Sequence, residues 1–182
     1  CASEANIKWF INTGTFWQHF QNLDYSPVNL YAATKQAFES VAQYYIDTNQ
    51  IKFNTIKLSD TFGPGDTRPK IFNLWEKVAK SGEFLNMSAG QQKIDISYID
   101  DIVNAFIVLI NHLKKDSPVI VNGACYAVKA KVRYTLKELS LIFEMTTRKK
   151  LNIHWDSIPY RKREVMNPWE KGDILPGWES KV

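Results

Sequence analysis

Apolar runs alternate along this chain with segments whose apolar positions recur every three or four residues, which predicts alternating strands and helices. We expect strands at about 7–12, 51–59, 94–98 and near 118–128. Helices are expected at about 29–48, 69–81, from about 100 onward, and from about 135 to 146. Within the helix at 29–48, one stripe consists of Leu30, Ala37, Phe38, Val41 and Tyr45. The alternation is typical of an α/β protein.

Local signals mark where several of these elements begin or end. Asp100 and Asp101 can cap the helix that follows the strand at 94–98. Thr135 and Glu138 have the spacing of a capping box, which opens the next helix. The tail from Ile158 is rich in Pro, Trp, Gly and charged residues, which predicts a lid or binding loop. No linker or repeat divides the chain, so we expect one domain over 1–182.

Composition excludes several classes of protein. With 45% hydrophobic and 23% charged residues in 182, the chain is typical of a soluble globular protein. A net charge of +4 is too mild to predict a nucleic-acid partner, and no apolar run approaches a membrane span. Cys1 and Cys125 are the two cysteines, so a reducing cytoplasm is expected. His19, His112 and His154 lack metal-ligand spacing; we interpret them as surface or packing residues and expect no metal.

The strongest candidate for chemistry is Tyr31 with Lys35. Residues four apart share one face of a helix, so the Lys35 ammonium would favour the ionised form of Tyr31 and lower its pKa. A phenol tuned in this way can exchange a proton near neutral pH. The alternative is a half-buried ring beside a solvated amine. The functional interpretation gains support from the preceding strand, which leads into Thr13, Gly14 and Thr15, because chemistry often lies at strand ends.

Four motifs occur in order along the chain: the strand leading to Thr15, the Tyr31-x-x-x-Lys35 pair, the run 58–66 (LSDTFGPGD) and the run 96–101 (ISYIDD). In this order they resemble the extended short-chain dehydrogenase/reductases of the NAD-dependent epimerase/dehydratase family. The segments 12–17 and 159–166 look most like the reductases of bacterial dideoxyhexose biosynthesis. The resemblance implies a Rossmann-like parallel sheet with a small substrate-binding lobe, formed mainly by about 63–95 and 118–182.

The resemblance also implies roles for individual residues. Tyr31 would be the general acid/base at the sugar oxygen, Lys35 would bind the nicotinamide ribose, and Thr15 would hydrogen-bond the reacting oxygen. Thr15 is preferred because the hydroxyl of the family lies past the strand end, and Thr13 is the alternative. The residues expected to contact the cofactor, NADP or NAD, are Thr13, Tyr31, Lys35, Asp60 and Thr61. Those expected to contact the substrate are Trp17, Asp60, Gln92, Lys93, Arg161 and Glu164.

Two of these positions depart from the pattern of relatives. Asp60 stands where many relatives have Asn, and Ile94 stands where several have an arginine for the pyrophosphate. Lys93 or Arg161 would serve instead. Arg161 is preferred because a guanidinium holds phosphate oxygens bidentately, and Glu164 could orient it. The alternative for Arg161 is an ordinary surface arginine.

The eight glycines include no Gly-x-Gly-x-x-Gly, the turn that holds the dinucleotide pyrophosphate in this family. The sequence therefore predicts a C-terminal fragment whose Gly-rich half lies outside it, and which would be inactive alone. The expected activity of the whole enzyme is NAD(P)-dependent reduction of a 4-keto nucleotide sugar of the CDP-4-keto-dideoxyhexose type, for O-antigen or surface polysaccharide. A 4-epimerase and a non-catalytic binding module stay open, and a homodimer through the helix bearing Tyr31 is plausible.

Overall fold

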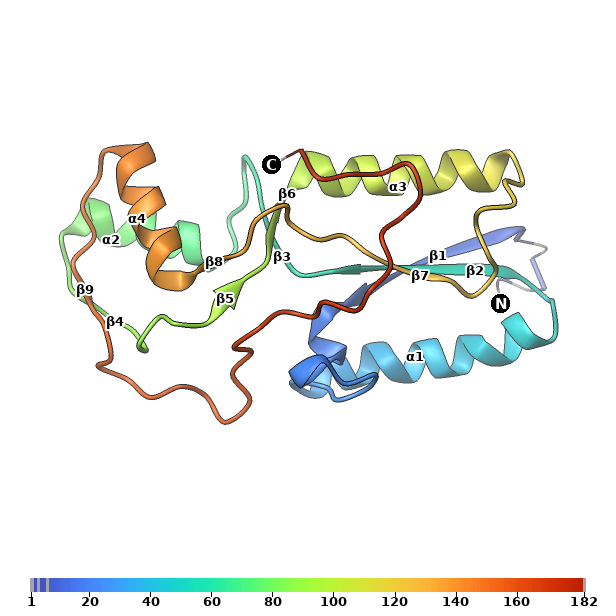
Figure 1. Ribbon diagram of the computed structural model, residues 1–182, viewed down its shortest axis with the longest axis horizontal. Helices are drawn as coiled ribbons and strands as arrows, with labels where there is room; N and C mark the ends of the chain where they lie inside the picture. Colours follow the sequence, from blue (N-terminus) through green and yellow to red (C-terminus); the bar gives the residue numbers. More distant parts are fainter. Residues whose placement is uncertain (1, 3, 6, 182) are drawn as a thin grey trace.

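The computed structural model describes residues 2, 4–5 and 7–181, and its centre is a three-stranded parallel sheet between two helices. The strands are β1 (Trp9–Thr15), β2 (Lys52–Leu58) and β7 (Cys125–Ala127), in the order β1-β2-β7. Helix α1 (Leu30–Asp47) covers one face of this sheet and α3 (Ile99–Lys114) covers the other (Figure 1). The predicted α/β class is confirmed.

Alternation along the strands explains the two cores. On the α1 side, Phe10 stacks on Phe53 at 5.4 Å, and Ala42 packs beside them. On the α3 side, Ile56 packs with Leu109 and with other buried residues of α3 and β7. Because neighbouring residues of a strand point to opposite faces, β2 can place Phe53 in one core and Ile56 in the other.

The apolar stripe predicted on α1 faces the sheet only in part. Phe38 contacts the rings of Phe10 and Phe53, and Tyr45 packs against the same core. Leu30 and Val41 are 79% and 62% exposed, whereas the buried positions of the helix are Ala32 and Ala42. Small residues let the helix approach the sheet closely, and the half-buried Glu39 on the same side bonds to polar groups of the sheet. The other members of the stripe, Leu30, Ala37 and Val41, lie on the exposed side of the helix.

A separate lobe lies beyond the end of the sheet (Figure 1). It contains α2 (Ile71–Ser81), α4 (Leu136–Thr147) and the short strands β4 (Leu85–Asn86), β5 (Lys93–Ile94), β8 (Tyr134–Thr135) and β9 (Ile153–His154). Trp75, Leu136 and Leu139 form its own core. Strands β3 (Asp60–Phe62) and β6 (Ile96–Tyr98) pair where the chain passes from the sheet to the lobe.

The substrate-binding lobe predicted mainly at about 63–95 and 118–182 stays a prediction, and these two ranges contribute to more than one core. Residues 125–127 belong to the central sheet, and Leu175 and Trp178 pack with the α3 core. The lobe core instead draws on 71–96 and 136–155. Leu175 and Trp178, apolar residues of the C-terminal tail, therefore pack in the α3 core and not in the core of the lobe. The sequence pattern shows that these residues prefer burial, but it does not show which core buries them.

The two predicted helix caps had different outcomes. The capping box is confirmed, because the Glu138 amide donates to Thr135 Oγ1 and the Thr135 amide donates to Glu138 Oε2 at 2.8 Å. The expected cap by Asp100 or Asp101 is wrong, since Tyr98 is the N-cap residue of α3 and both aspartates lie in its first turn. There they favour the helix through its dipole.

The C-terminal tail matches the expected irregular segment. Residues 158–173, which we call the strap, contain no helix or strand apart from one bridge between Asp173 and Tyr126. Figure 1 shows the strap running back from the lobe to the sheet. In the part of the chain that the structure describes, no helix has the length and apolarity needed to cross a membrane.

Candidate functional site

The predicted acid/base pair lies at the start of α1. Asn29 caps the helix by accepting a hydrogen bond from the Ala32 amide at 3.0 Å, which places Tyr31 in the first turn. The Lys35 ammonium lies 5.8 Å from the centre of the Tyr31 ring and donates to the Thr13 carbonyl at 3.0 Å. Tyr31 itself is 53% exposed. The helix therefore presents a half-exposed phenol and a fixed cation at the carboxyl end of β1.

Gly14 allows this helix to lie so close to the strand. A Cβ at Gly14 would come within 2.8 Å of both Glu39 Oε1 and the Lys57 side chain. The Lys57 ammonium in turn pairs with Glu39 at 3.2 Å. A side chain at position 14 would displace the side chains of Glu39 and Lys57, and with them the ion pair between α1 and the sheet.

Thr15 is the last residue of β1 (Trp9–Thr15), in agreement with the predicted strand that leads to it. Thr15 is 8% exposed, and its hydroxyl oxygen accepts a hydrogen bond from the Trp17 amide at 3.3 Å. It caps a 3-10 turn, η1 (Phe16–Gln18), with the Gln18 side chain returning to its amide. Thr13, two residues earlier, is less buried and adjoins Lys35.

A cavity of about 940 Å³ lies between the sheet and the lobe. This volume is at the upper end of what small-molecule sites usually offer. The cavity is lined by all six predicted substrate residues and by Thr61. Thr13, Thr15, Tyr31 and Lys35 do not line it, although the adjacent Asn29 does. The structure thus brings the six predicted substrate residues together around one cavity and leaves the four residues predicted for acid/base and ribose contacts outside its lining.

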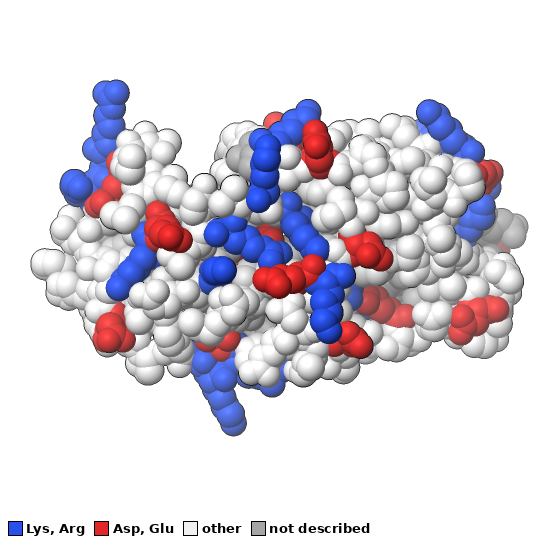
Figure 2. All heavy atoms as spheres, viewed as in Figure 1, with Lys and Arg blue, Asp and Glu red and all other residues white. Residues whose placement is uncertain are grey.

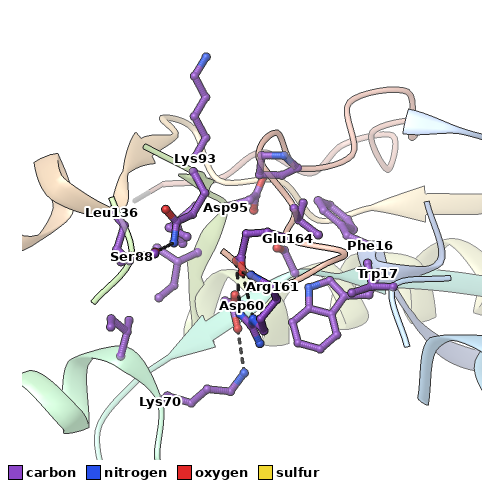
Figure 3. A pocket seen from close by; sticks show the side chains of 18 of the residues that line it. Phe16, Trp17, Asp60, Lys70, Ser88, Lys93, Asp95, Leu136, Arg161 and Glu164 are labelled. Atoms are coloured by element: carbon purple, nitrogen blue, oxygen red, sulfur yellow. Dashed lines mark hydrogen bonds and ion pairs between the residues drawn. The ribbon is translucent and has the colours of Figure 1, made fainter. Parts of the chain in front are cut away.

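Charged side chains converge at one wall of the cavity (Figure 3). Asp60, the first residue of β3, accepts a hydrogen bond from the Lys70 ammonium at 2.8 Å. Arg161 from the strap is held by Glu164, with Nε 3.0 Å from Oε2 and Nη2 3.3 Å from Oε1. The predicted orientation of Arg161 by Glu164 is confirmed, and this contact raises the pKa of Arg161 above its ordinary value.

Basic groups outside these pairs also face this region. Lys93 and Lys162 line the cavity, and Figure 2 shows Lys and Arg gathered near the middle of the face drawn, with Asp and Glu between them. Gln92 is 6% exposed, and its Oε1 has no hydrogen-bond partner among the described residues. A buried carbonyl oxygen without a partner is costly unless water or a ligand supplies a donor. The cavity can therefore bind an anionic ligand that also offers hydrogen-bond donors.

Sequence reasoning missed several cavity residues. Asp95, 1% exposed, accepts hydrogen bonds from Arg133 Nε at 2.7 Å and from the Ala130 amide at 3.2 Å. Burial raises the pKa of Asp95 although Arg133 opposes the shift. Lys70 and Trp169 also line the cavity. Only a tertiary contact reveals Arg133, because it lies 38 residues from Asp95.

His19, interpreted from the sequence as a packing or surface residue, is a buried wall residue of the cavity. It lies between two 3-10 turns, η1 and η2 (Phe20–Asn22). Its pKa is lowered to about 4, first by burial and then by the Lys57 ammonium. The imidazole is therefore neutral at physiological pH.

Comparisons with known proteins agree with this geometry. The sequence model of the NAD dependent epimerase/dehydratase family matches residues 12–123. The chain is 29% identical over 165 residues to the CDP-abequose synthase of Yersinia pseudotuberculosis, covering 90% of this chain and 56% of that protein. It is 26% identical over 178 residues to the CDP-abequose synthase of Salmonella muenchen, covering 95% and 58%. The chain thus spans little more than half the length of these relatives.

Solved structures share the fold. The whole chain superposes on 58% of DesIV, a dTDP-glucose 4,6-dehydratase from Streptomyces venezuelae with NAD and TYD bound, with a TM-score of 0.82 and 17% identity. It also superposes on 61% of the UDP-glucose 4-epimerase of Thermus thermophilus in complex with NAD, with a TM-score of 0.76 and 16% identity. The predicted Rossmann-like fold is confirmed.

Proposed function

Because this chain belongs to the NAD dependent epimerase/dehydratase family, we propose that it carries the acid/base group and the substrate cavity of an NAD(P)-dependent reductase of a 4-keto nucleotide sugar. The substrate proposed is of the CDP-4-keto-dideoxyhexose type, used for O-antigen or surface polysaccharide. One observation supports this most directly: Asn29, the residue that caps the helix of Tyr31 and Lys35, lines a cavity of about 940 Å³ that Arg161 also lines. Similarity to the CDP-abequose synthases supports the choice of nucleotide.

The residues at the end of β1 fit the nicotinamide end of NAD or NADP. The Lys35 ammonium is held at the Thr13 carbonyl, where it can reach a ribose, and Asp60 and Thr61 begin the strand after β2. When bound, the cofactor would supply the hydride. The phosphate-binding Gly-rich turn has no counterpart among these 182 residues, so they would hold only part of the cofactor.

The chain's own residues would manage the proton and the charge. Tyr31 would give its proton to the C4 oxygen of the sugar, and Lys35 would stabilise the phenolate left behind. A hydroxyl of Thr15 or Thr13 would hydrogen-bond the same oxygen. Thr15 stays the preferred residue. Thr13 pairs with Ile56 in the sheet and therefore points to the α3 side, away from the helix that carries Tyr31.

The remaining substrate residues would bind and orient the nucleotide sugar. Arg161, aligned by Glu164, offers a planar donor pair to the pyrophosphate, and Gln92 Oε1 offers an acceptor. Phe16 and Trp17 follow Thr15 where the dehydratases of the family have an Asp-Glu pair. Neither has an acid/base group, which supports reduction over dehydration. A homodimer through the exposed face of α1 is part of the proposal.

The direct test is Tyr31→Phe in the complete enzyme, with reduction of a CDP-4-keto sugar followed by oxidation of NADPH or NADH. We expect kcat to fall by roughly 100-fold or more, because the general acid is removed. Tyr44→Phe, a change to an exposed tyrosine on the same helix, is the matched control and should retain full activity. Full kcat in Tyr31→Phe would refute the assigned role.

Two further measurements separate the alternatives. A 4-epimerase would interconvert C4 isomers with no net consumption of NAD(P)H, whereas a reductase consumes one equivalent per product. A binding module would show neither activity. Fluorescence titration of NADH and NADPH into this chain, and into a form extended at its N-terminus, tests it directly, and absence of binding by both would favour the module.

A further inference from the structure

Trp169 of the strap lies at the junction between the sheet and the cavity. Its ring lies parallel to that of His19, with centres 3.9 Å apart and planes at 8°, and it meets the edge of Phe16 at 5.4 Å. Trp169 is buried, and the Lys57 ammonium lies 5.5 Å from its ring. A tryptophan fixed on several sides is a strong anchor for a segment without secondary structure.

His19 is itself held at both ring nitrogens. Nε2 lies 2.8 Å from the Lys57 ammonium, and Nδ1 lies 3.1 Å from the Leu23 carbonyl. An ammonium can only donate, so Nε2 is the acceptor and Nδ1 carries the hydrogen that it donates to Leu23. Neither nitrogen is left for a ligand or a proton transfer. What His19 offers to the rest of the molecule is the face of its ring, which Trp169 covers.

This contact connects the strap to the helix that carries the acid/base pair. Lys57 is 4% exposed and pairs with Glu39 at 3.2 Å. Glu39 lies one turn beyond Lys35 on α1. A continuous series of contacts therefore runs from Trp169 through His19 and Lys57 to α1.

The strap has further contacts on both sides of Trp169. Arg163 donates to Ser26 Oγ at 2.7 Å and lies 4.2 Å from the centre of the Phe20 ring. On the other side, the Glu170 amide donates to Asn22 Oδ1 at 2.7 Å. These contacts all fall within 163–170, so Arg161 lies on the span of the strap between its anchors and the lobe.

We propose that His19 is a positioning residue: the face of its ring holds Trp169 and thereby keeps the strap, with Arg161 and Glu164, over the substrate cavity. The functional part of this inference rests on the proposed function, since it predicts weaker substrate binding rather than slower chemistry. The structural part does not, and it can be tested without any substrate.

Trypsin measures the structural part in the chain as it is, because the strap has four cleavage sites, at Arg161, Lys162, Arg163 and Lys171. The assay follows the three sites at 161–163. Cleavage requires the backbone to leave its folded position, so its rate reports local opening. His19→Gln keeps groups that can accept from Lys57 and donate to Leu23 but has no ring face. His19→Phe keeps the ring face and loses both polar contacts.

We expect His19→Gln to be cleaved at 161–163 roughly fivefold to tenfold faster than the parent. This ratio corresponds to the free energy of about one aromatic contact, which the variant loses. His19→Phe should stay within about threefold of the parent. His112→Gln is the matched control, because His112 contacts the carbonyl of Pro176, beyond the strap, and should leave cleavage at 161–163 unchanged. Circular dichroism of each variant checks that it is folded.

The functional part uses the complete enzyme. His19→Gln should raise the KM for the nucleotide sugar by a similar fivefold to tenfold with kcat within about twofold, and His19→Phe should restore KM. Equal cleavage of His19→Gln and the parent would overturn the positioning role, as would fast cleavage of His19→Phe. Altered cleavage with unchanged KM would overturn the link to the substrate. If neither the parent nor any variant turns over the sugar, the proposed function is refuted. The trypsin result still tests the positioning role of His19, because that assay needs no substrate.

Discussion

Replacing Arg133 tests how much the buried ion pair between Arg133 and Asp95, a cavity residue, contributes to stability. The Asp95 carboxylate is fully buried, and its charged partner is Arg133, with Nε 2.7 Å from Oδ2. Arg133 also donates to the Trp169 carbonyl at 2.8 Å. Arg133→Met keeps much of the side-chain volume but takes away the charged donor, while the Ala130 amide continues to donate to Asp95.

We expect Arg133→Met to lower the free energy of unfolding by about 3–5 kcal/mol at pH 7, the usual cost of leaving one member of a buried pair unpaired. Since small domains are stable by about 5–15 kcal/mol, the variant should be folded but fragile. Adding Asp95→Asn to Arg133→Met removes the carboxylate charge that was left unpaired. The double variant should therefore recover a large part of the lost free energy of unfolding.

The pH dependence has a definite sign. Burial already raises the pKa of Asp95 above its ordinary value, and loss of Arg133 removes the main opposing influence. The folded variant therefore binds a proton more readily than its unfolded chain does. The contribution of Asp95 to stability is fullest at low pH and falls as the pH rises from the unfolded pKa, near 4, through the folded one. The loss relative to the parent should thus be smaller at pH 5 than at pH 7.5.

Urea unfolding of the parent, both single variants and the double variant at the two pH values measures these quantities. Arg68→Met is the matched control, because Arg68 pairs with Asp66 at the surface, 2.6 Å apart, and its loss should cost less than about 1 kcal/mol. A loss below about 1 kcal/mol for Arg133→Met, or strict additivity of the two single changes, would refute the reasoning.

Three other predictions concern single side chains. Thr135→Ala should lower the free energy of unfolding by about 1 kcal/mol in the same urea assay, since it removes one half of the capping box, and an unchanged midpoint would contradict that cap. Burial raises the pKa of Cys125 to about 11, so iodoacetamide at pH 8 should alkylate it about 100-fold more slowly than an ordinary thiol. Peptide mass mapping distinguishes Cys125 from Cys1. Equal alkylation rates for Cys125 and an ordinary thiol would argue against burial. The pKa of His19 is lowered to about 4, so the unfolded chain binds a proton there at higher pH than the folded one. The parent should therefore lose up to about 3 kcal/mol more between pH 6.5 and pH 4 than His19→Phe does, because the variant lacks this group.

The sequence by itself determined the helices, two strands of the central sheet and the family. Periodicity predicted β1, α1, β2 and α4 to within a few residues, because strands and helices bury apolar residues at their own spacing. The capping box was readable because its two partners lie three residues apart. The ordered motifs also pointed to the correct family.

Tertiary structure alone decided which surfaces are covered. Periodicity shows that α1 has an apolar stripe, but the close approach of the sheet buries Ala32 and Ala42 and leaves Leu30 and Val41 outside. The cavity likewise gathers residues from 16 to 169, and contacts such as Arg133 with Asp95 or Trp169 with His19 join positions far apart in the chain. A local pattern records which residues prefer burial or a partner, whereas the partner is chosen only when distant segments pack together.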